Sequence, residues 1–318
     1  MTLPQPRIPG TTYFITTRCE RREFRLPPTE ETSAGIAVAL AEAAERTQVR
    51  VVAASAPGNH LHVVVHDETG RVSDFMRDAF SLIGRFCNAR DGVKDMGFWN
   101  RQPAVAIALG DPETVVAKVA YVIANPVTSF LVPQLSDWPG LKLEISDLGR
   151  WWGPIYKRPD IFFRKNGRVS EEVQVWSELP PMVERAFGVA GFQKRVKAAV
   201  DRLVAEAHAE AKRKGHGFVG IAKILRQSVW NKPSSPNERK AGDAAEAIRR
   251  VAAATEARLR QMTQALLAFR AAHRVAWEAY RRGLRPTFPG GAYKAWRYYG
   301  AAREDITVPW AVCSSPSG

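Results

Sequence analysis

The stretch Asn59-His60-Leu61-His62-Val63-Val64-Val65 decides the fold, because it combines a strand pattern with two histidines on one face. β-Branched residues dominate it and the turn-forming Pro57-Gly58 precedes it, so a β-strand is predicted. Side chains alternate along a strand, which places His60 and His62 about 6–7 Å apart on the same side. Two imidazoles at that spacing can bind one divalent cation, which would compensate for their burial.

Later in the chain, a helix is predicted over 112–124. Its last residues belong to the motif Tyr121-Val122-Ile123-Ala124-Asn125-Pro126-Val127. Asp111 is placed to cap its first turn, and Pro126 is expected to end it. Polar residues recur at helical spacing on a stripe separate from the valines: Thr114, Lys118, Tyr121 and Asn125. A phenol, an ammonium group and an amide on one helix face would suit phosphodiester chemistry.

These motifs resemble the single-tyrosine HUH transposases, where HUH denotes His-hydrophobic-His, and most nearly the REP-associated tyrosine transposases. The resemblance spans roughly residues 8–145 and includes three further segments. These are Tyr13-Phe14-Ile15-Thr16-Thr17-Arg18, Gly97-Phe98-Trp99-Asn100-Arg101 and Asp137-Trp138-Pro139.

The chain departs from the family pattern in two places. Pro57-Gly58-Asn59-His60 stands where many relatives have Met-Pro-Asn-His, and Val127-Thr128-Ser129 stands where Val-Arg-Ala is common. The second departure removes a basic residue beside the tyrosine.

The resemblance implies a metal-dependent enzyme whose nucleophile is Tyr121. Its phenolic oxygen would attack a phosphorus of single-stranded or hairpin DNA, giving a 5′-phosphotyrosine and a free 3′-OH that can later be rejoined. His60 and His62 match the family's ligands for Mg²⁺ or Mn²⁺, although imidazole by itself favours zinc-like ions. Asn125 matches the third ligand, and it could equally cap the end of the helix.

Four basic residues are candidate DNA contacts: Lys118, Arg18, Arg21 and Arg22. Lys118 precedes the tyrosine by one turn and could hold the scissile phosphate or simply be a solvated helix lysine. The three arginines, with Arg25, follow the first strand. They could grip single-stranded or hairpin DNA, or they could form a solvated loop.

Periodicity predicts an α+β fold, with a ferredoxin-like antiparallel sheet that has helices on one face, followed by a mostly α-helical C-terminal domain. Strands are expected at 11–18, 49–55, 60–66 and 104–109, and helices at 30–47, 72–89, 112–124, 192–213 and 241–282. We therefore expect a HUH tyrosine transposase catalytic domain at 1–150, a connector at 151–191 and a basic helical DNA-binding extension at 192–318. The pattern leaves open whether the tyrosine helix packs within its own chain or against a partner in a homodimer.

The net charge of +14 lies entirely in the second half of the chain. Residues 1–150 carry 16 basic and 17 acidic residues, whereas 151–318 carry 30 and 15. Such an excess indicates a polyanion partner, namely DNA, although an alanine- and arginine-rich composition from a GC-rich genome is the alternative. No apolar run is long enough to cross a bilayer, and three cysteines without zinc spacing favour a reducing cytoplasm. The family resemblance implies a bacterial, nucleoid-associated protein.

The last described motif mixes aromatic and basic side chains: Tyr293, Lys294, Trp296, Arg297, Tyr298 and Tyr299. Such a mixture can stack nucleotide bases, although aromatic residues in a C-terminal segment more often serve packing.

The predicted activity is DNA transposition on REP-like palindromic repeats. One alternative is a relaxase or replication initiator with the same chemistry, but those enzymes usually place the tyrosine in other contexts, often in pairs. The other is a catalytically idle DNA-binding protein that regulates a genomic repeat, and the presence of His60, His62 and Tyr121 argues against it.

Overall fold

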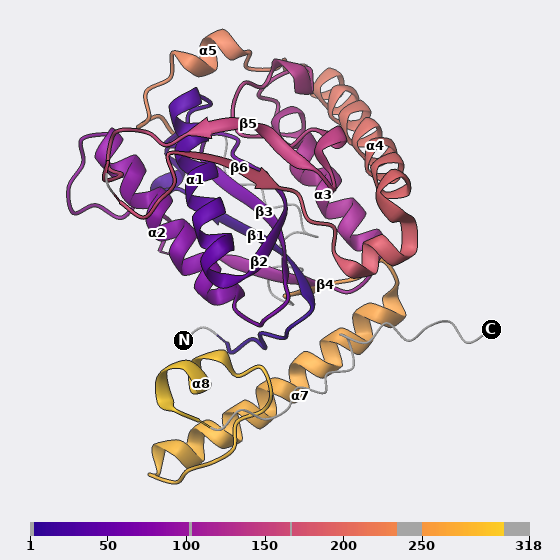
Figure 1. Ribbon diagram of the computed structural model, residues 1–318. Helices are drawn as coiled ribbons and strands as arrows, with labels where there is room; N and C mark the ends of the chain where they lie inside the picture. Colours follow the sequence, from indigo (N-terminus) through magenta and orange to yellow (C-terminus); the bar gives the residue numbers. More distant parts are fainter. Residues whose placement is uncertain (1–2, 102–103, 166, 234–249, 302–318) are drawn as a thin grey trace.

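The structure is a computed structural model that describes residues 3–101, 104–165, 167–233 and 250–301. Its main elements, in chain order (Figure 1), are β1 (Thr11–Arg18), α1 (Glu30–Thr47), β2 (Val49–Ser55), β3 (His60–Asp67), α2 (Val72–Arg90), β4 (Val105–Leu109), α3 (Pro112–Thr128), β5 (Trp151–Lys157), β6 (Glu172–Trp176), α4 (Pro181–Lys214), α5 (Ile221–Leu225), β7 (Val251–Ala252), α7 (Glu256–Arg281) and α8 (Tyr293–Tyr299). Short 3₁₀ turns lie at Glu20–Arg22, Leu135–Asp137 and Ile145–Asp147. The strands and helices predicted for the first half are all present.

The central sheet has five strands in the order β2-β3-β1-β4-β7. The first four pair antiparallel, as predicted, whereas β7 pairs with β4 in parallel, so the prediction of a wholly antiparallel sheet is wrong. The backbone N–H groups of Ala108 and Gly110 donate to the carbonyls of Arg250 and Ala252. The edge of β4 offers unsatisfied backbone groups, and a segment from far along the chain satisfies them.

Helices cover both faces of this sheet, so the prediction of helices on one face is also wrong. Strand register places Phe14 and His62 on the same face, and the ring of Tyr121 on α3 contacts both. The opposite face of β1 continues to Cys19, whose buried thiol lies near Cys87 on α2; burial and that thiol raise its pKa. α1 packs on α2, with Gly35 against the ring of Phe86. Side chains of the central strands are buried on both faces of the sheet, so each face needs a layer of helices to cover it.

The segment predicted as a connector contains the antiparallel β5–β6 hairpin and packs against the sheet and α1. Ser177 Oγ donates to the carbonyl of Val52 at 2.7 Å, and Trp152 Nε1 donates to the carbonyl of Lys142 at 2.6 Å. Trp152 is fully buried in the same apolar cluster as the central strands. The domain boundaries at 150 and 191 remain predictions.

The C-terminal elements are helical, as predicted, with different bounds. α4 begins at Pro181 instead of 192 and changes direction at Gly188, where φ is +60°. Of the helix expected at 241–282, residues 241–249 lie outside the described residues, as does the expected break at 234–237. Val251–Ala252 form strand β7 instead of helix, and the helix runs from Glu256 to Arg281. α4 packs on α3, and α7 extends below the sheet in Figure 1.

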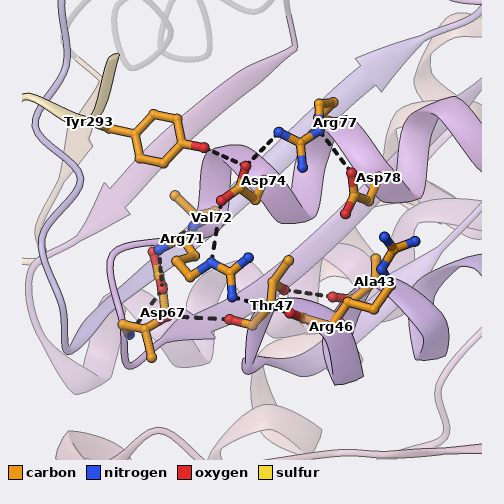
Figure 2. Close-up of polar contacts among 11 residues, drawn as sticks. Ala43, Arg46, Thr47, Asp67, Arg71, Val72, Asp74, Arg77, Asp78 and Tyr293 are labelled. Atoms are coloured by element: carbon orange, nitrogen blue, oxygen red, sulfur yellow. Dashed lines mark hydrogen bonds and ion pairs between the residues drawn. The ribbon is translucent and has the colours of Figure 1, made fainter. Parts of the chain in front are cut away.

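The α8 segment is fastened to the first half of the chain. Tyr293 Oη donates a hydrogen bond to Asp74 on α2, and Asp74 also accepts from Arg71 and Arg77 (Figure 2). The backbone N–H of Arg7 donates to the carbonyl of Gly291 at 2.9 Å. Among the described helices, none combines the length and the apolar character needed to cross a bilayer.

Candidate active site

His60 and His62 lie side by side at the start of β3, directly after the Pro57-Gly58 turn. Their ring centroids are 4.6 Å apart, and His62 is 5% exposed. Gly58 makes this turn possible, because its φ is +90° and an added Cβ would lie 2.0 Å from the ring of Phe24. The prediction that the two histidines share a face is confirmed.

α3 carries the second half of the site. Asp111 caps it by accepting from the backbone N–H of Thr114 at 2.7 Å. The prediction that Pro126 ends the helix is wrong. The helix continues through Pro126 to Thr128. A proline in the last turn leaves out one backbone hydrogen bond, and the carbonyl of Pro126 still accepts from the N–H of Leu131 at 3.0 Å. Asn125 is therefore a buried residue inside the helix, not its cap.

Tyr121 lies against the histidines within the same chain. Its ring meets His62 edge-on with centroids 5.2 Å apart, and Phe14 with centroids 5.9 Å apart. The side chain is only partly buried. The phenol ring therefore lies beside the ring of His62, on a helix of the same chain, and its side chain is partly exposed.

Asn125 joins the same group. A side-chain hydrogen bond links it to His60, and its Oδ1 accepts from Ser129 Oγ at 3.1 Å. Sequence reasoning missed Ser129 as a site residue; its signal was the spacing of four from Asn125 on a helix. The Ser129 hydroxyl thus holds the side-chain amide of Asn125 from one turn further along the helix.

Both histidines are kept neutral. Desolvation lowers the pKa of His60 to about 3, and the charges of Arg18 and Arg22 add to that effect while the Asn125 bond opposes it. Burial lowers the pKa of His62 well below its usual value, and His60, Arg18 and Lys118 lower it further. Neutral imidazole is the form that binds metal ions.

The ring nitrogens test whether a cation fits. Asn59 Oδ1 lies 2.6 Å from His60 Nδ1 and can only accept, so Nδ1 carries the proton and Nε2 keeps its lone pair. Neither ring nitrogen of His62 has a hydrogen-bond partner among the described residues. Buried nitrogens without partners are what a missing ligand leaves behind. Two imidazoles therefore fit a divalent cation with open positions, and the Asn125 amide beside His60 offers its oxygen as a third donor when the amide plane is turned.

Carboxylates and thiols do not complete this set. Across the described ranges, no group of three or more His, Cys, Asp or Glu residues could hold a metal ion. Asn125 is thus the third donor that the described residues offer beside His60 and His62.

Positive charge surrounds the histidines unevenly. Arg18 pairs with His60 across the β1–β3 ladder, and the Lys118 ammonium lies 5.3 Å from the ring centroid of Phe14. Arg22 acts on His60 through its charge, whereas Arg21 is exposed on the 3₁₀ turn at Glu20–Arg22.

Two other predicted surface residues are structural. Arg25 is fully buried, its Nη2 lies 2.9 Å from Asp91 Oδ2, and its guanidinium stacks on Phe98. His66, expected at the surface, is 3% exposed and its Nδ1 lies 3.1 Å from Thr12 Oγ1. The fully paired sheet buries this end of β3, which a single-strand pattern does not reveal.

Comparison with known proteins identifies one weak structural similarity. No protein-family profile matches the chain, and no curated protein matches it. A solved structure of a REP-associated tyrosine transposase bound to a REP hairpin aligns with 53% of this chain and 97% of its own, at 21% identity and a TM-score of 0.39. A TM-score that low does not establish a shared fold.

Proposed function

We propose that this chain cleaves and rejoins single-stranded or hairpin DNA, with Tyr121 as the nucleophile. The observation that carries the proposal is the contact of the Tyr121 ring with His62, because it brings a phenol to a pair of neutral, partly unsatisfied imidazoles. The order β1-α1-β2-β3-α2-β4, with neighbours β2-β3-β1-β4, supports a ferredoxin-like fold for this unit.

The proposed step exchanges one ester bond for another. The phenolic oxygen of Tyr121 forms a bond to phosphorus while the P–O3′ bond breaks. The phenol proton passes to solvent and the departing 3′ oxygen takes up a proton, leaving a 5′-phosphotyrosine and a free 3′-OH. A phenol with an ordinary pKa near 10 leaves more readily than an alcohol, so a 3′-OH can reverse the step and rejoin DNA.

His60, His62 and Asn125 would hold the divalent cation, Mg²⁺ or Mn²⁺, which when bound neutralises charge on the phosphate oxygens. Arg18 and Lys118 add positive potential at the histidines, as the lowered pKa of His62 indicates. Arg21 and Arg22 extend this potential along the turn after β1, where the backbone of hairpin DNA, including REP-like palindromic repeats, would bind.

Trapping the covalent intermediate tests the proposal. Wild-type protein incubated with 3′-labelled single-stranded or hairpin DNA and Mn²⁺ should give a labelled adduct that survives denaturing electrophoresis. Tyr121→Phe should lower adduct yield at least about a thousandfold, because it removes the attacking oxygen, while DNA affinity stays near that of the wild type.

Tyr156→Phe is the matched control, since this buried tyrosine lies on the β5–β6 hairpin and should leave the adduct unchanged. DNA binding without any adduct from the wild type would refute the enzyme and favour the DNA-binding protein. An adduct that persists in Tyr121→Phe would assign the nucleophile to another residue.

A further inference from the structure

Three aromatic rings from α7 and α8, elements that do not carry the histidines, form a cluster. The rings of Trp277 and Tyr280 stack 5.6 Å apart at an interplanar angle of 20°. Tyr299 contacts them both, with centroids 5.4 Å and 5.6 Å away. We call Trp277, Tyr280 and Tyr299 the aromatic platform.

The platform rests on a small core of its own. Phe269, Ala276, Phe288, Ala292 and Ala295 form a buried cluster against which Trp277 packs. The Tyr293 hydroxyl bonded to Asp74 fastens α8 beside it (Figure 2). The rings are thus held in place before any partner arrives, which lowers the entropy lost on binding.

The platform nevertheless faces solvent. Tyr280 and Tyr299 are 37% and 46% exposed, and on α8 Trp296 and Tyr298 are 41% and 59% exposed. Several neighbouring rings are thus exposed together, and a contiguous exposed apolar patch marks a binding surface more often than scattered exposed rings do.

The chain segment that carries the platform is rich in basic residues. Residues 271–300 contain six basic side chains and one acidic one. Arg274 and Arg281 flank Trp277 at helical spacing, and Arg285 follows in the exposed turn. Within the described ranges, the guanidinium groups of these three arginines form no ion pair and no side-chain hydrogen bond.

A second exposed aromatic pair has a more acidic setting than the platform. Trp151 and Trp176 are 57% and 41% exposed on the β5–β6 hairpin, with ring centroids 5.2 Å apart. They line a cavity with Glu45, Glu172 and Glu178, and with Arg50 as its basic residue. An anionic partner therefore suits the aromatic platform, which has basic neighbours in the sequence, better than the Trp151–Trp176 pair, which lies among glutamates.

We propose that the aromatic platform binds unpaired nucleotides, with bases stacked on the rings and phosphates held by Arg274, Arg281 and Arg285. Stacking on aromatic rings with cations along the backbone is how single-stranded nucleic acid is held without sequence readout. The inference builds on the proposed function, to which it adds a second DNA-contacting surface. Asp111, the cap of the tyrosine helix, accepts from the N–H of Ala254 at 2.7 Å, which ties α7 to the catalytic helix.

Fluorescence anisotropy of the full-length protein with a labelled oligothymidylate and with a duplex of equal length tests the platform. Tyr280→Ala/Tyr299→Ala should weaken single-strand binding at least about tenfold and duplex binding less, because bases in a duplex are already stacked. Tyr280→Phe/Tyr299→Phe keeps the rings and should bind as the wild type does. Trp151→Ala/Trp176→Ala, the matched aromatic control, should also be unchanged.

Charge gives an independent readout that does not depend on the packing of the rings. Arg274→Gln/Arg281→Gln/Arg285→Gln should reduce the slope of log affinity against log salt by up to about 2, at roughly 0.7 per lost phosphate contact. Unchanged single-strand affinity in the alanine and glutamine variants would overturn the platform. A changed oligomeric state by sedimentation, with DNA affinity intact, would overturn it in favour of a protein interface.

These outcomes are separable from those of the proposed function. A covalent adduct with no effect of the platform variants would refute the platform alone. Platform-dependent binding without an adduct would refute the Tyr121 chemistry alone.

Discussion

His62 shows at the scale of one residue how function opposes stability. It is buried on the sheet, its ring stacks on Phe14 with centroids 5.4 Å apart, and neither nitrogen is satisfied by the described residues. A buried polar group without partners costs about 1–3 kcal/mol, which a protein retains where the group has another use.

Replacing His62 by leucine should stabilise the metal-free protein, because the unsatisfied nitrogens disappear while an apolar side chain remains. We expect the free energy of unfolding in EDTA to rise by about 1 kcal/mol, measured by urea denaturation. Mn²⁺ should then no longer stabilise the variant. His66→Leu is the control and should destabilise, since His66 is bonded to Thr12. A less stable His62→Leu protein in EDTA would contradict this account.

Ser129 acts through its neighbour and is a positioning residue. A serine hydroxyl can donate or accept, so it can hold the Asn125 amide plane with either end toward His60. We expect Ser129→Ala to weaken Mn²⁺ binding about tenfold, the lower end for residues that orient metal ligands, measured by calorimetric titration.

Thr128→Val is the matched change for Ser129→Ala, because Thr128 Oγ1 reaches the backbone carbonyl of Asn125 at 3.4 Å and not its side chain. Its Mn²⁺ affinity should equal that of the wild type. Equal losses in both variants would point to a general disturbance of the helix end instead of a role for the Ser129 hydroxyl.

At the scale of elements, the site depends on the turn that leads into β3. Gly58 has a φ of +90°. Its carbonyl accepts a hydrogen bond from the backbone N–H of Leu26 at 2.7 Å. The turn thereby sets where the strand begins and where the first histidine stands. Neither the backbone conformation nor the ring of Phe24 beneath it leaves room for a side chain.

Gly58→Ala should destabilise the fold by about 1–3 kcal/mol, the cost of forcing a residue with a Cβ into a disfavoured backbone region, with displacement of Phe24 in addition. Urea denaturation measures the change. Gly217→Ala is the control, because its backbone is not left-handed and its Cβ would meet nothing within 4 Å. Equal stability of the two variants would show that the turn adapts.

At the scale of the whole molecule, the C-terminal elements are joined to the catalytic sheet by β7 and by the Tyr293–Asp74 bond. Burial alone would raise the pKa of Asp74, but bonds from Tyr293 and Arg71 and the charge of Arg77 outweigh it, so the pKa is lowered. A carboxyl with a lowered folded-state pKa stabilises above its unfolded pKa and loses that contribution as the pH falls through the folded value.

Tyr293→Phe should therefore loosen α8 at neutral pH, with a loss of about 1.5–3 kcal/mol for a hydrogen bond to a charged group. Hydrogen exchange of the α8 amides at pH 7 and at pH 3 measures it. The difference from wild type should shrink at pH 3, because lowering the pH moves toward the lowered pKa of the Asp74 carboxyl. Tyr280→Phe should behave as wild type at both values, and a pH-independent effect of Tyr293→Phe would contradict the charge-based account.

Local pattern was sufficient where a residue's role follows from its neighbours in sequence. Alternation placed His60 and His62 on one face, and helical spacing placed Tyr121 and Asn125 on one stripe; the structure brings all four together. Both periodicities come from the backbone itself, with two residues per repeat in a strand and 3.6 per turn in a helix. These repeats are visible in the sequence before any tertiary contact forms.

Tertiary structure alone decided which surfaces those elements cover. The parallel pairing of β7, the second helical layer, the burial of His66 and the continuation of α3 through Pro126 all contradict predictions made from sequence. Each depends on partners distant along the chain that satisfy backbone groups or cover apolar faces. The amino-acid sequence by itself determined the chemical groups of this protein and their spacing. Long-range packing determined which of them meet, because burial and hydrogen-bond satisfaction are properties of the assembled molecule.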